Sequence, residues 1–204
     1  MKLRHIAALT LGCLIATTAS AHDPKTDAPP PMTPEQQAAM AAWQKASTPN
    51  ERHQQLIAEF AGTWNTKMTS WMDPSAPPQV ETGKSVNTAV LGGRQLRMDY
   101  SGQFMGQPFQ GMGYTGYDNV TGKYFSTWSD NMSTGLFVAE GSYDAAGKVY
   151  NYTATMNDPM QNGAPVPVRE TMRVVDKDHV TFEMYETRDG KERKSMQIEY
   201  TRAK

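Results

Sequence analysis

The spacing of apolar residues along the chain changes at Gly62. Before it, Leu56 and Phe60 lie four residues apart, which is the spacing of side chains on one face of an α-helix. After it, apolar and polar residues alternate in steps of two, as they do on a β-strand with one buried face. The pattern predicts a helical segment over residues 33–61 and a β domain over residues 62–204.

Two helix-start signals precede this change. Thr33 can cap a first helix, with Gln36 completing a capping box, and this helix is expected to end near Ser47. The same pattern recurs at Thr48 and Glu51 and predicts the start of a second helix. The apolar stripe of the second helix indicates that one of its faces packs on a core.

Ten later stretches have the alternation of strands and are separated by turn residues. They are residues 64–72, 80–90, 94–101, 108–117, 123–130, 134–143, 148–156, 168–175, 179–187 and 193–201. Most linkers are short, which favours antiparallel hairpins, and no crossover helix for a parallel sheet is visible. Closure would remove both sheet edges. We therefore predict an all-β fold, an antiparallel up-and-down barrel of about ten strands, with the N-terminal helices plugging one end.

The faces predicted to point inward carry aromatic residues, methionines and a few charged groups. We interpret them as the lining of a ligand cavity, because aromatic walls with a few polar groups are typical of such sites. The candidate residues are Arg94, Met98, Tyr100, Trp128, Asp130, Tyr152, Glu170, Met172 and Met184. A filled barrel is the alternative, and a register slip of one residue would exchange these candidates for their neighbours.

The first residues have the pattern of an export signal. A positive start precedes an apolar run over residues 6–16, and Ala19-Ser20-Ala21 is a small-residue cleavage site. We expect residues 1–21 to be a signal peptide that is cleaved after Ala21, and residues 22–32 to be a disordered, proline-rich leader. The predicted location is periplasmic or secreted. Lipidation at Cys13 is a disfavoured alternative, because the residues before it fit an acylation site poorly.

Charge and cysteine content narrow the possible partners. The chain carries a formal net charge of −1, and loss of Lys2 and Arg4 with the signal makes the mature chain more negative. This balance gives no support for nucleic acid as a partner, and no later apolar run is long enough for a membrane span. The only cysteine, Cys13, lies in the predicted signal, so stability must come from a core rather than from disulfides. The oligomeric state is left open.

No motif for catalysis, a cofactor or a metal stands out. The glycine-rich stretch from Gly106 to Gly116 lacks the Lys and helix start of a phosphate loop, so we interpret its glycines as sites of strand bending. His53 and His179 are too isolated for a zinc site or a triad. Copper binding by methionine pairs such as Met68 and Met72 is a disfavoured alternative to core filling. We therefore assign no catalytic residue, no metal ligand and no cofactor.

The sequence also resembles known proteins. A helix followed by Gly62-x-Trp64, with Arg202 in the last strand, resembles the calycin superfamily of lipocalins and fatty-acid-binding proteins. That resemblance implies that Trp64 packs at a closed barrel end with Arg202 across it. At family level the stretches HQQLIAEFAGTW, VLGGRQL, GQPFQGMGYTGYDNVTGKYFSTWSD and IEYTR resemble the DUF1579 family of uncharacterised, often exported bacterial proteins. This family resemblance implies a barrel and no particular activity.

The favoured function is binding of a small, partly apolar molecule inside the barrel, without catalysis. An enzyme that uses a buried carboxylate or tyrosine is one alternative, and an interaction protein with a filled barrel is another. A cavity containing a carboxylate with a strongly perturbed pKa would favour the enzyme. An open apolar cavity without one would favour the binding protein, and a filled interior with a large apolar outer patch would favour the interaction protein.

Overall fold

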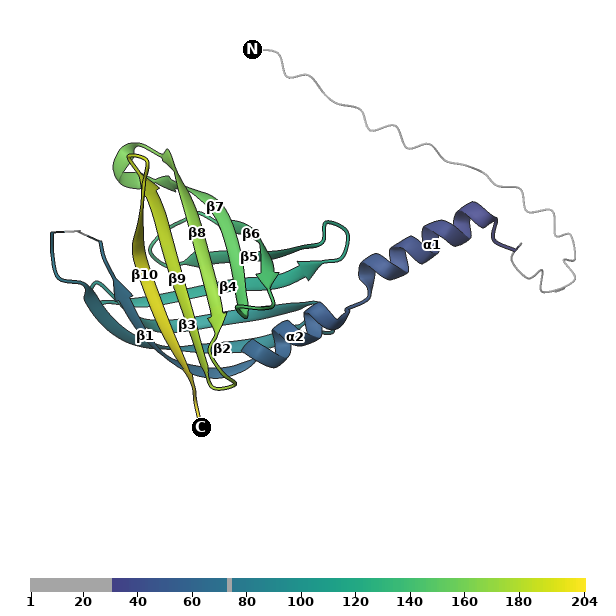
Figure 1. Ribbon diagram of the computed structural model, residues 1–204, viewed down its shortest axis with the longest axis horizontal. Helices are drawn as coiled ribbons and strands as arrows, with labels where there is room; N and C mark the ends of the chain where they lie inside the picture. Colours follow the sequence, from purple (N-terminus) through teal and green to yellow (C-terminus); the bar gives the residue numbers. More distant parts are fainter. Residues whose placement is uncertain (1–30, 73–74) are drawn as a thin grey trace, which may run out of the picture.

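The computed structural model describes residues 31–72 and 75–204, and its described part is a barrel with helices at one side (Figure 1). The predicted signal peptide, residues 1–21, and the leader as far as residue 30 lie outside the described residues. The helices are α1 (Pro34–Ser47), α2 (Glu51–Phe60) and the 3-10 helix η1 (Pro159–Gln161). The strands are β1 (Gly62–Ser70), β2 (Gln79–Val90), β3 (Gln95–Phe104), β4 (Gln107–Asp118), β5 (Lys123–Asp130), β6 (Phe137–Asp144), β7 (Val149–Asp158), β8 (Ala164–Val174), β9 (His179–Arg188) and β10 (Lys191–Arg202).

The ten strands form one closed barrel in which each strand pairs antiparallel with its neighbours in the chain. The remaining seam joins β1 to β10, where Trp64 lies opposite Arg202. The predicted fold class is therefore confirmed. The alternation within strands follows from closure, because every second side chain points into the barrel and the others face solvent. In the described part of the chain, none of the helices has the length and apolar character needed to cross a membrane.

Strand β8 begins earlier than predicted. The predicted strand starts at Val168, but β8 starts at Ala164 and includes Pro165 and Pro167. They are exposed and alternate with Val166 and Val168, which are buried. Burial of the two valines on the inner face thus outweighs the turn preference of the prolines.

The two α-helices have different roles. Helix α1 has the predicted Thr33–Gln36 capping box, but none of its residues is buried and it projects away from the barrel (Figure 1). Its last turn is held by Asn119 of the β4–β5 turn, whose side-chain amide donates to the Ala46 and Thr48 carbonyls. The expectation that both helices plug the barrel is wrong for α1, since its exposed residues, including Trp43, make no core contact.

Helix α2 closes one barrel end. Its N-cap is Asn50, with His53 completing the capping box, so the predicted cap at Thr48 is wrong. Thr48 is instead the C-cap of α1, where its hydroxyl donates to the Gln44 carbonyl, and the Asn50 side chain accepts the backbone N–H of residue 52. The helix buries His53, Leu56 and Phe60 against the strands, as its apolar stripe predicts.

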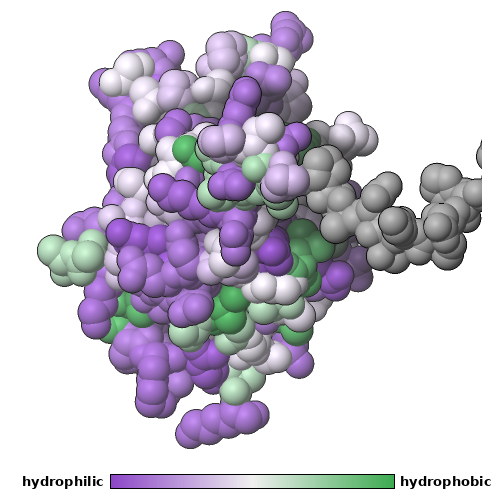
Figure 2. All heavy atoms as spheres, turned by 90° about the vertical axis from the view of Figure 1, so that its right-hand side faces the viewer, coloured by the Kyte–Doolittle hydropathy of each residue, from purple (hydrophilic) through white to green (hydrophobic). Residues whose placement is uncertain are grey.

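The core lies next to α2 and is rich in tyrosine. The rings of Tyr150 and Tyr124 meet edge to face with centroids 5.0 Å apart, and Phe60 meets Tyr150 at 5.3 Å. The Tyr150 hydroxyl donates to Glu59 Oε2 of α2 at 2.6 Å. Apolar and polar contacts therefore fix the helix on the barrel together. Outside this core, the face toward which α1 points is mostly hydrophilic, with small separate apolar groups (Figure 2).

The glycines of β4 allow close approach of an aromatic ring. A Cβ on Gly111 would lie 2.1 Å from Cζ2 of Trp128, so the indole ring lies directly over the glycine backbone. The glycines from Gly106 to Gly116 are interpreted from the sequence as sites of strand bending. At Gly111 the structure gives a different reason for the glycine, because the Trp128 ring occupies the space that a side chain would fill.

Candidate functional site

The end of the barrel nearest α2 is sealed by Trp64 and Arg202. Trp64 is 1% exposed, and its Nε1–H donates to the Phe60 carbonyl at 2.9 Å. Asn87 donates to the same carbonyl at 2.9 Å. The Arg202 guanidinium lies 4.1 Å from the Trp64 ring centroid, a cation–π geometry. The contact that the calycin resemblance implies is therefore present in the structure.

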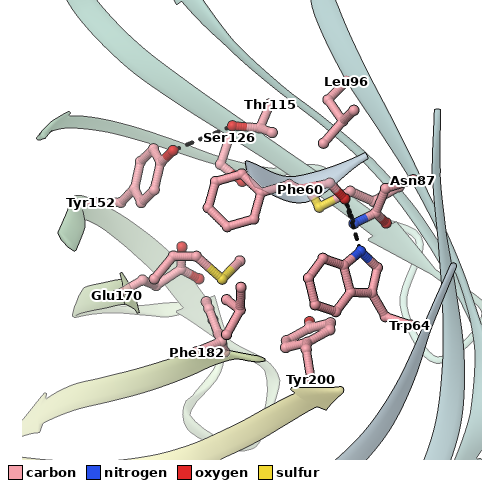
Figure 3. Close-up of a pocket in the computed structure, with 13 residues that line it drawn as sticks. Phe60, Trp64, Asn87, Leu96, Thr115, Ser126, Tyr152, Glu170, Phe182 and Tyr200 are labelled. Carbon is pink, nitrogen blue, oxygen red and sulfur yellow. Dashed lines mark hydrogen bonds between the residues drawn. The ribbon is translucent and has the colours of Figure 1, made fainter. Parts of the chain in front are cut away.

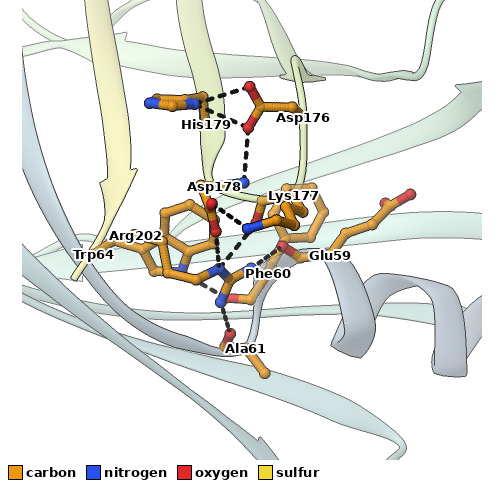
Figure 4. A network of polar contacts seen from close by, with 9 residues as sticks. All are labelled: Glu59, Phe60, Ala61, Trp64, Asp176, Lys177, Asp178, His179 and Arg202. Atoms are coloured by element: carbon orange, nitrogen blue, oxygen red, sulfur yellow. Dashed lines mark hydrogen bonds and ion pairs between the residues drawn. The ribbon is translucent and has the colours of Figure 1, made fainter. Parts of the chain in front are cut away.

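Each of the three guanidinium nitrogens of Arg202 donates a hydrogen bond at this end (Figure 4). Nη1 donates to the Ala61 carbonyl at 2.7 Å, Nη2 to the Glu59 carbonyl at 3.1 Å, and Nε to the Lys177 carbonyl at 2.9 Å. Asp178 Oδ1 lies 3.6 Å from Nε. Arg202 thus joins the end of α2 to the β8–β9 turn.

Gly62 makes room for this arginine. Its φ is 118°, a conformation that side chains disfavour, and a Cβ would lie 2.9 Å from Arg202 Nη1. The three residues assigned to barrel closure from the sequence, Gly62, Trp64 and Arg202, therefore lie at one place.

Below the seal, the barrel encloses a cavity toward which side chains from α2 and from strands around the barrel converge (Figure 3). The empty space among them is about 560 Å³ including the part open to solvent, and the centres of water molecules could occupy about 40 Å³ of it. The lining residues are Phe60, Trp64, Asn87, Leu96, Met98, Thr115, Ser126, Tyr152, Glu170, Met172, Val180, Phe182 and Tyr200. As it stands, the cavity has room for about three water molecules.

Four of the nine candidates from the sequence line this cavity: Met98, Tyr152, Glu170 and Met172. Four more lie outside this lining set, on the same inner faces of their strands but farther from α2: Tyr100, Trp128, Asp130 and Met184. Tyr100 is 6% exposed and accepts from the Thr66 hydroxyl, and the Trp128 Nε1–H donates to Asp130. Eight of the nine candidates therefore lie in the barrel interior, four in the cavity lining and four farther from α2.

The inward placement predicted for Arg94 is wrong. Strand β3 begins at Gln95, and Arg94 ends the turn before it, exposed to solvent. Its Nη1 donates to the Leu91 carbonyl at 3.0 Å. The glycines at positions 92 and 93 have positive φ and extend the turn by one residue beyond the predicted start of the strand.

Sequence reasoning missed several lining residues. Ser126 and Tyr200 could have been found, because each lies two residues from a residue that was already assigned an inward or closing position. Phe60 belongs to the apolar stripe of α2, which shows that it is buried but not that it reaches a cavity. Asn87 carries no such signal, since an asparagine within a strand usually faces solvent.

Glu170 is the exceptional group in the cavity. Its side chain is 8% exposed, and no hydrogen bond or ion pair joins it to any residue that the structure describes. Burial raises the pKa of this carboxyl to about 7. The described lining residues include no Lys, Arg or His that could neutralise it.

Two tyrosines share the cavity with Glu170. Tyr152 lies directly opposite it on β7, and Tyr200 comes from β10. Burial, and then the nearby negative charge of Glu170, raise the pKa of the Tyr152 hydroxyl, which is 3.3 Å from Thr115 Oγ1. Burial also raises the pKa of Tyr200. Both phenols therefore stay neutral at physiological pH, and Glu170 is the group in this cavity that titrates there.

The chain is similar to one protein family and to solved structures, of which Rv2717c supports the fold. A family described as "Protein of unknown function (DUF1579)" matches residues 48–202. The crystal structure of Rv2717c from M. tuberculosis is similar, with a TM-score of 0.55, 15% identity, and 74% of this chain and 98% of that chain covered. The structure of EF1p2_mFAP2b bound to DFHBI has a TM-score of 0.38 and 12% identity, with the same coverage of 74% and 98%. No curated protein matches the chain.

Proposed function

The chain belongs to the DUF1579 family, and we propose that its barrel binds a small, partly apolar molecule in the cavity beside α2. The observation that carries the proposal is Glu170, a carboxyl that is buried without a partner and points into an aromatic-walled space (Figure 3). An unpaired buried polar group costs stability, so its presence calls for an explanation, and a ligand that pairs with it is the simplest one.

The ligand would be held mainly by burial of apolar surface against side chains such as Phe182 and Met172, at roughly 25 cal/mol per Å². Glu170, Ser126 and Asn87 would set its orientation through polar contacts.

Size limits what this cavity can bind tightly. A ligand filling only the present space has about three non-hydrogen atoms, which at about 1.5 kcal/mol each gives at best a millimolar dissociation constant. Tighter binding requires a longer molecule that extends past Met184, or movement of the lining side chains. Such an extension would meet Tyr100 and Trp128, which lie on the inner faces of their strands farther from α2.

Export is part of the proposal. The support is the signal pattern of residues 1–21, which lie outside the described structure. Fractionation of the cell of origin should place the protein in the periplasm or medium, with an intact mass that begins at His22. A full-length mass in the cytoplasm would contradict export and leave the binding proposal untouched.

Native mass spectrometry of the mature protein from its own compartment is the decisive experiment for binding. We expect a reproducible extra mass on the native wild-type protein that disappears on denaturation, and a lower occupancy in Glu170→Gln. A bare mass in repeated preparations, together with no binding from a small-molecule panel, would contradict the proposal and favour a filled structural barrel.

A catalytic role is the second candidate, because Glu170 meets the criterion given above for an enzyme: a cavity carboxyl with a pKa of about 7 is what a general acid or base requires. We rank binding first because the described lining residues include no second group that titrates near neutral pH and could act as the complementary acid or base. In a binding role the molecule released on denaturation is identical to the one supplied. In a catalytic role wild-type protein would return it altered, and Glu170→Gln would return it unchanged. Comparing the two released masses separates the candidates.

A further inference from the structure

The two buried carboxylates in the described chain differ in their partners. Asp158, 4% exposed, pairs with Arg188 and accepts the Met160 backbone N–H at 2.8 Å. Arg188 lowers the pKa of Asp158, so this carboxylate is ionised and neutralised within the protein. Glu170, 8% exposed, has neither kind of partner. A partner that lets it ionise at low cost must therefore come from outside the residues that the structure describes.

The negative charge of Glu170 determines which charge a ligand in the cavity should carry. Glu170 is the one ionisable carboxyl among the described lining residues, and none of them is a cation. Arg202, at the adjoining seal, stacks on the Trp64 ring and donates to backbone carbonyls. A ligand carboxylate would find no counter-charge and would be repelled by Glu170. A cation would find one, in a setting where little water competes.

The walls of the cavity suit a cation as well. Trp64, Tyr152, Phe182 and Tyr200 line the space around Glu170, and aromatic faces attract ammonium groups. The thioether of Met172 and the apolar rings can contact a short hydrocarbon body. Carboxylate, aromatic faces and a small apolar space are the elements of an amine-binding site.

We propose that the molecule bound in the cavity is a small organic cation, a protonated amine with a short apolar body, whose ammonium group donates hydrogen bonds to the Glu170 carboxylate. This inference rests on the proposed function that a small molecule binds in the barrel. It adds the chemical class of the ligand and names the group that recognises it.

Three test compounds with one carbon skeleton isolate the charge: n-butylamine, n-butanol and n-butyrate. All three are longer than the present space, so each requires the same movement of lining side chains or extension toward Met184, and a comparison among them still reports the charge. Each is titrated calorimetrically at pH 8 into the mature wild-type protein, Glu170→Gln and Glu199→Gln. Glu199 is the matched control, because it is an exposed glutamate on the outer face of β10, where it pairs with Lys67. Folding of every variant is checked by circular dichroism.

We expect butylamine to bind wild-type protein roughly 10- to 100-fold more tightly than butanol, as a charge-assisted hydrogen bond in a buried site would give. Butyrate should bind more weakly than butanol. Glu170→Gln should abolish the preference for the amine and retain butanol binding, whereas Glu199→Gln should behave as wild type. Retained butanol binding shows that a folded Glu170→Gln cavity is intact.

A pH series tests the same contact. Tyr152 on β7 and Tyr200 on β10 remain neutral, and the described residues of β9 that face Glu170 are apolar: Val180 and Phe182 in the lining, and Met184 opposite Glu170. With a Glu170 pKa of about 7, butylamine should bind roughly tenfold more weakly at pH 6 than at pH 8, because the protonated carboxyl no longer pairs with ammonium. Butanol binding should be flat over this range.

Equal affinity for amine and alcohol, or tighter binding of butyrate, would overturn the amine proposal and leave cavity binding standing. An amine preference that survives in Glu170→Gln would also overturn it. Failure of all three compounds to bind at millimolar concentration, together with a bare native mass, would overturn both proposals.

Discussion

Buried polar groups have hydrogen-bond partners at the sealed end of the barrel, whereas a carboxyl in the cavity beneath it has none among the described residues. At the seal, the Phe60 carbonyl accepts from both Trp64 and Asn87, and Arg202 donates to three backbone carbonyls. In the cavity, Glu170 is buried with no partner. The seal has the paired polar contacts expected of a region that stabilises the fold. The cavity instead keeps an unpaired carboxyl, which a purely stabilising region would exclude.

The largest effect that would test this comparison is expected from Trp64→Ala at the seal. Loss of a fully buried indole leaves a void and removes the surface on which Arg202 stacks, so the free energy of unfolding should fall by about 3–5 kcal/mol. Urea unfolding followed by circular dichroism measures it. Trp43→Ala on α1 is the control: this ring is 73% exposed, and the change should stay within about 0.5 kcal/mol. An unchanged melting temperature in Trp64→Ala would contradict the role of the seal.

A smaller change in the free energy of unfolding, of opposite sign, is expected from Glu170→Gln. Burial raises the folded-state pKa from 4.5 to about 7, so the stability contributed by the protonated carboxyl is complete below about pH 4.5 and is lost as pH rises through 7. Relative to wild type, Glu170→Gln should therefore gain about 3 kcal/mol between pH 4 and pH 8. Thermal unfolding at both pH values, without ligand, measures this gain.

Glu199→Gln serves as the control here too, because its carboxyl is half exposed and screened by solvent. The difference between its stability and that of wild type should be nearly the same at pH 4 and pH 8. If Glu170→Gln also shows a constant difference, the carboxyl is not desolvated in solution, and the contrast between seal and cavity disappears.

The smallest effect is expected from Arg202→Lys. Lysine keeps the charge but cannot donate to three carbonyls in one plane while stacking on Trp64, so the free energy of unfolding should fall by about 1–2 kcal/mol. Arg97→Lys, an exposed arginine paired with Asp99, should cost less than about 0.5 kcal/mol. Equal losses in the two variants would show that the seal does not depend on guanidinium geometry.

Much of the barrel could be predicted from the sequence, because strand alternation is a local signal. The step of two assigned Met98, Tyr152, Glu170 and Met172 to inner faces, and each lines the cavity. The prediction for Arg94 was wrong because strand ends are set by backbone geometry in the preceding turn, and two consecutive glycines leave that geometry open.

The state of the interior could not be predicted in the same way. Whether Glu170 has a partner depends on which side chains reach it from β7, β9 and β10, contacts that are distant in sequence. The same holds for Asn87, whose acceptor Phe60 lies 27 residues earlier on a helix. Alternation indicates which face is buried, but the size of the remaining space is the outcome of all these side chains packing together.

The seam between β1 and β10 has a consequence for the order in which the barrel can assemble. Arg202 contacts the Ala61 carbonyl across 141 residues, so the ends of a very long loop must meet before this pairing forms. Until β10 docks, the other strands form an open sheet with two unpaired edges, the arrangement most exposed to aggregation. We therefore expect folding to be slow and dominated by non-local pairing, with the interval before the last strand docks as the period when a chaperone would matter most.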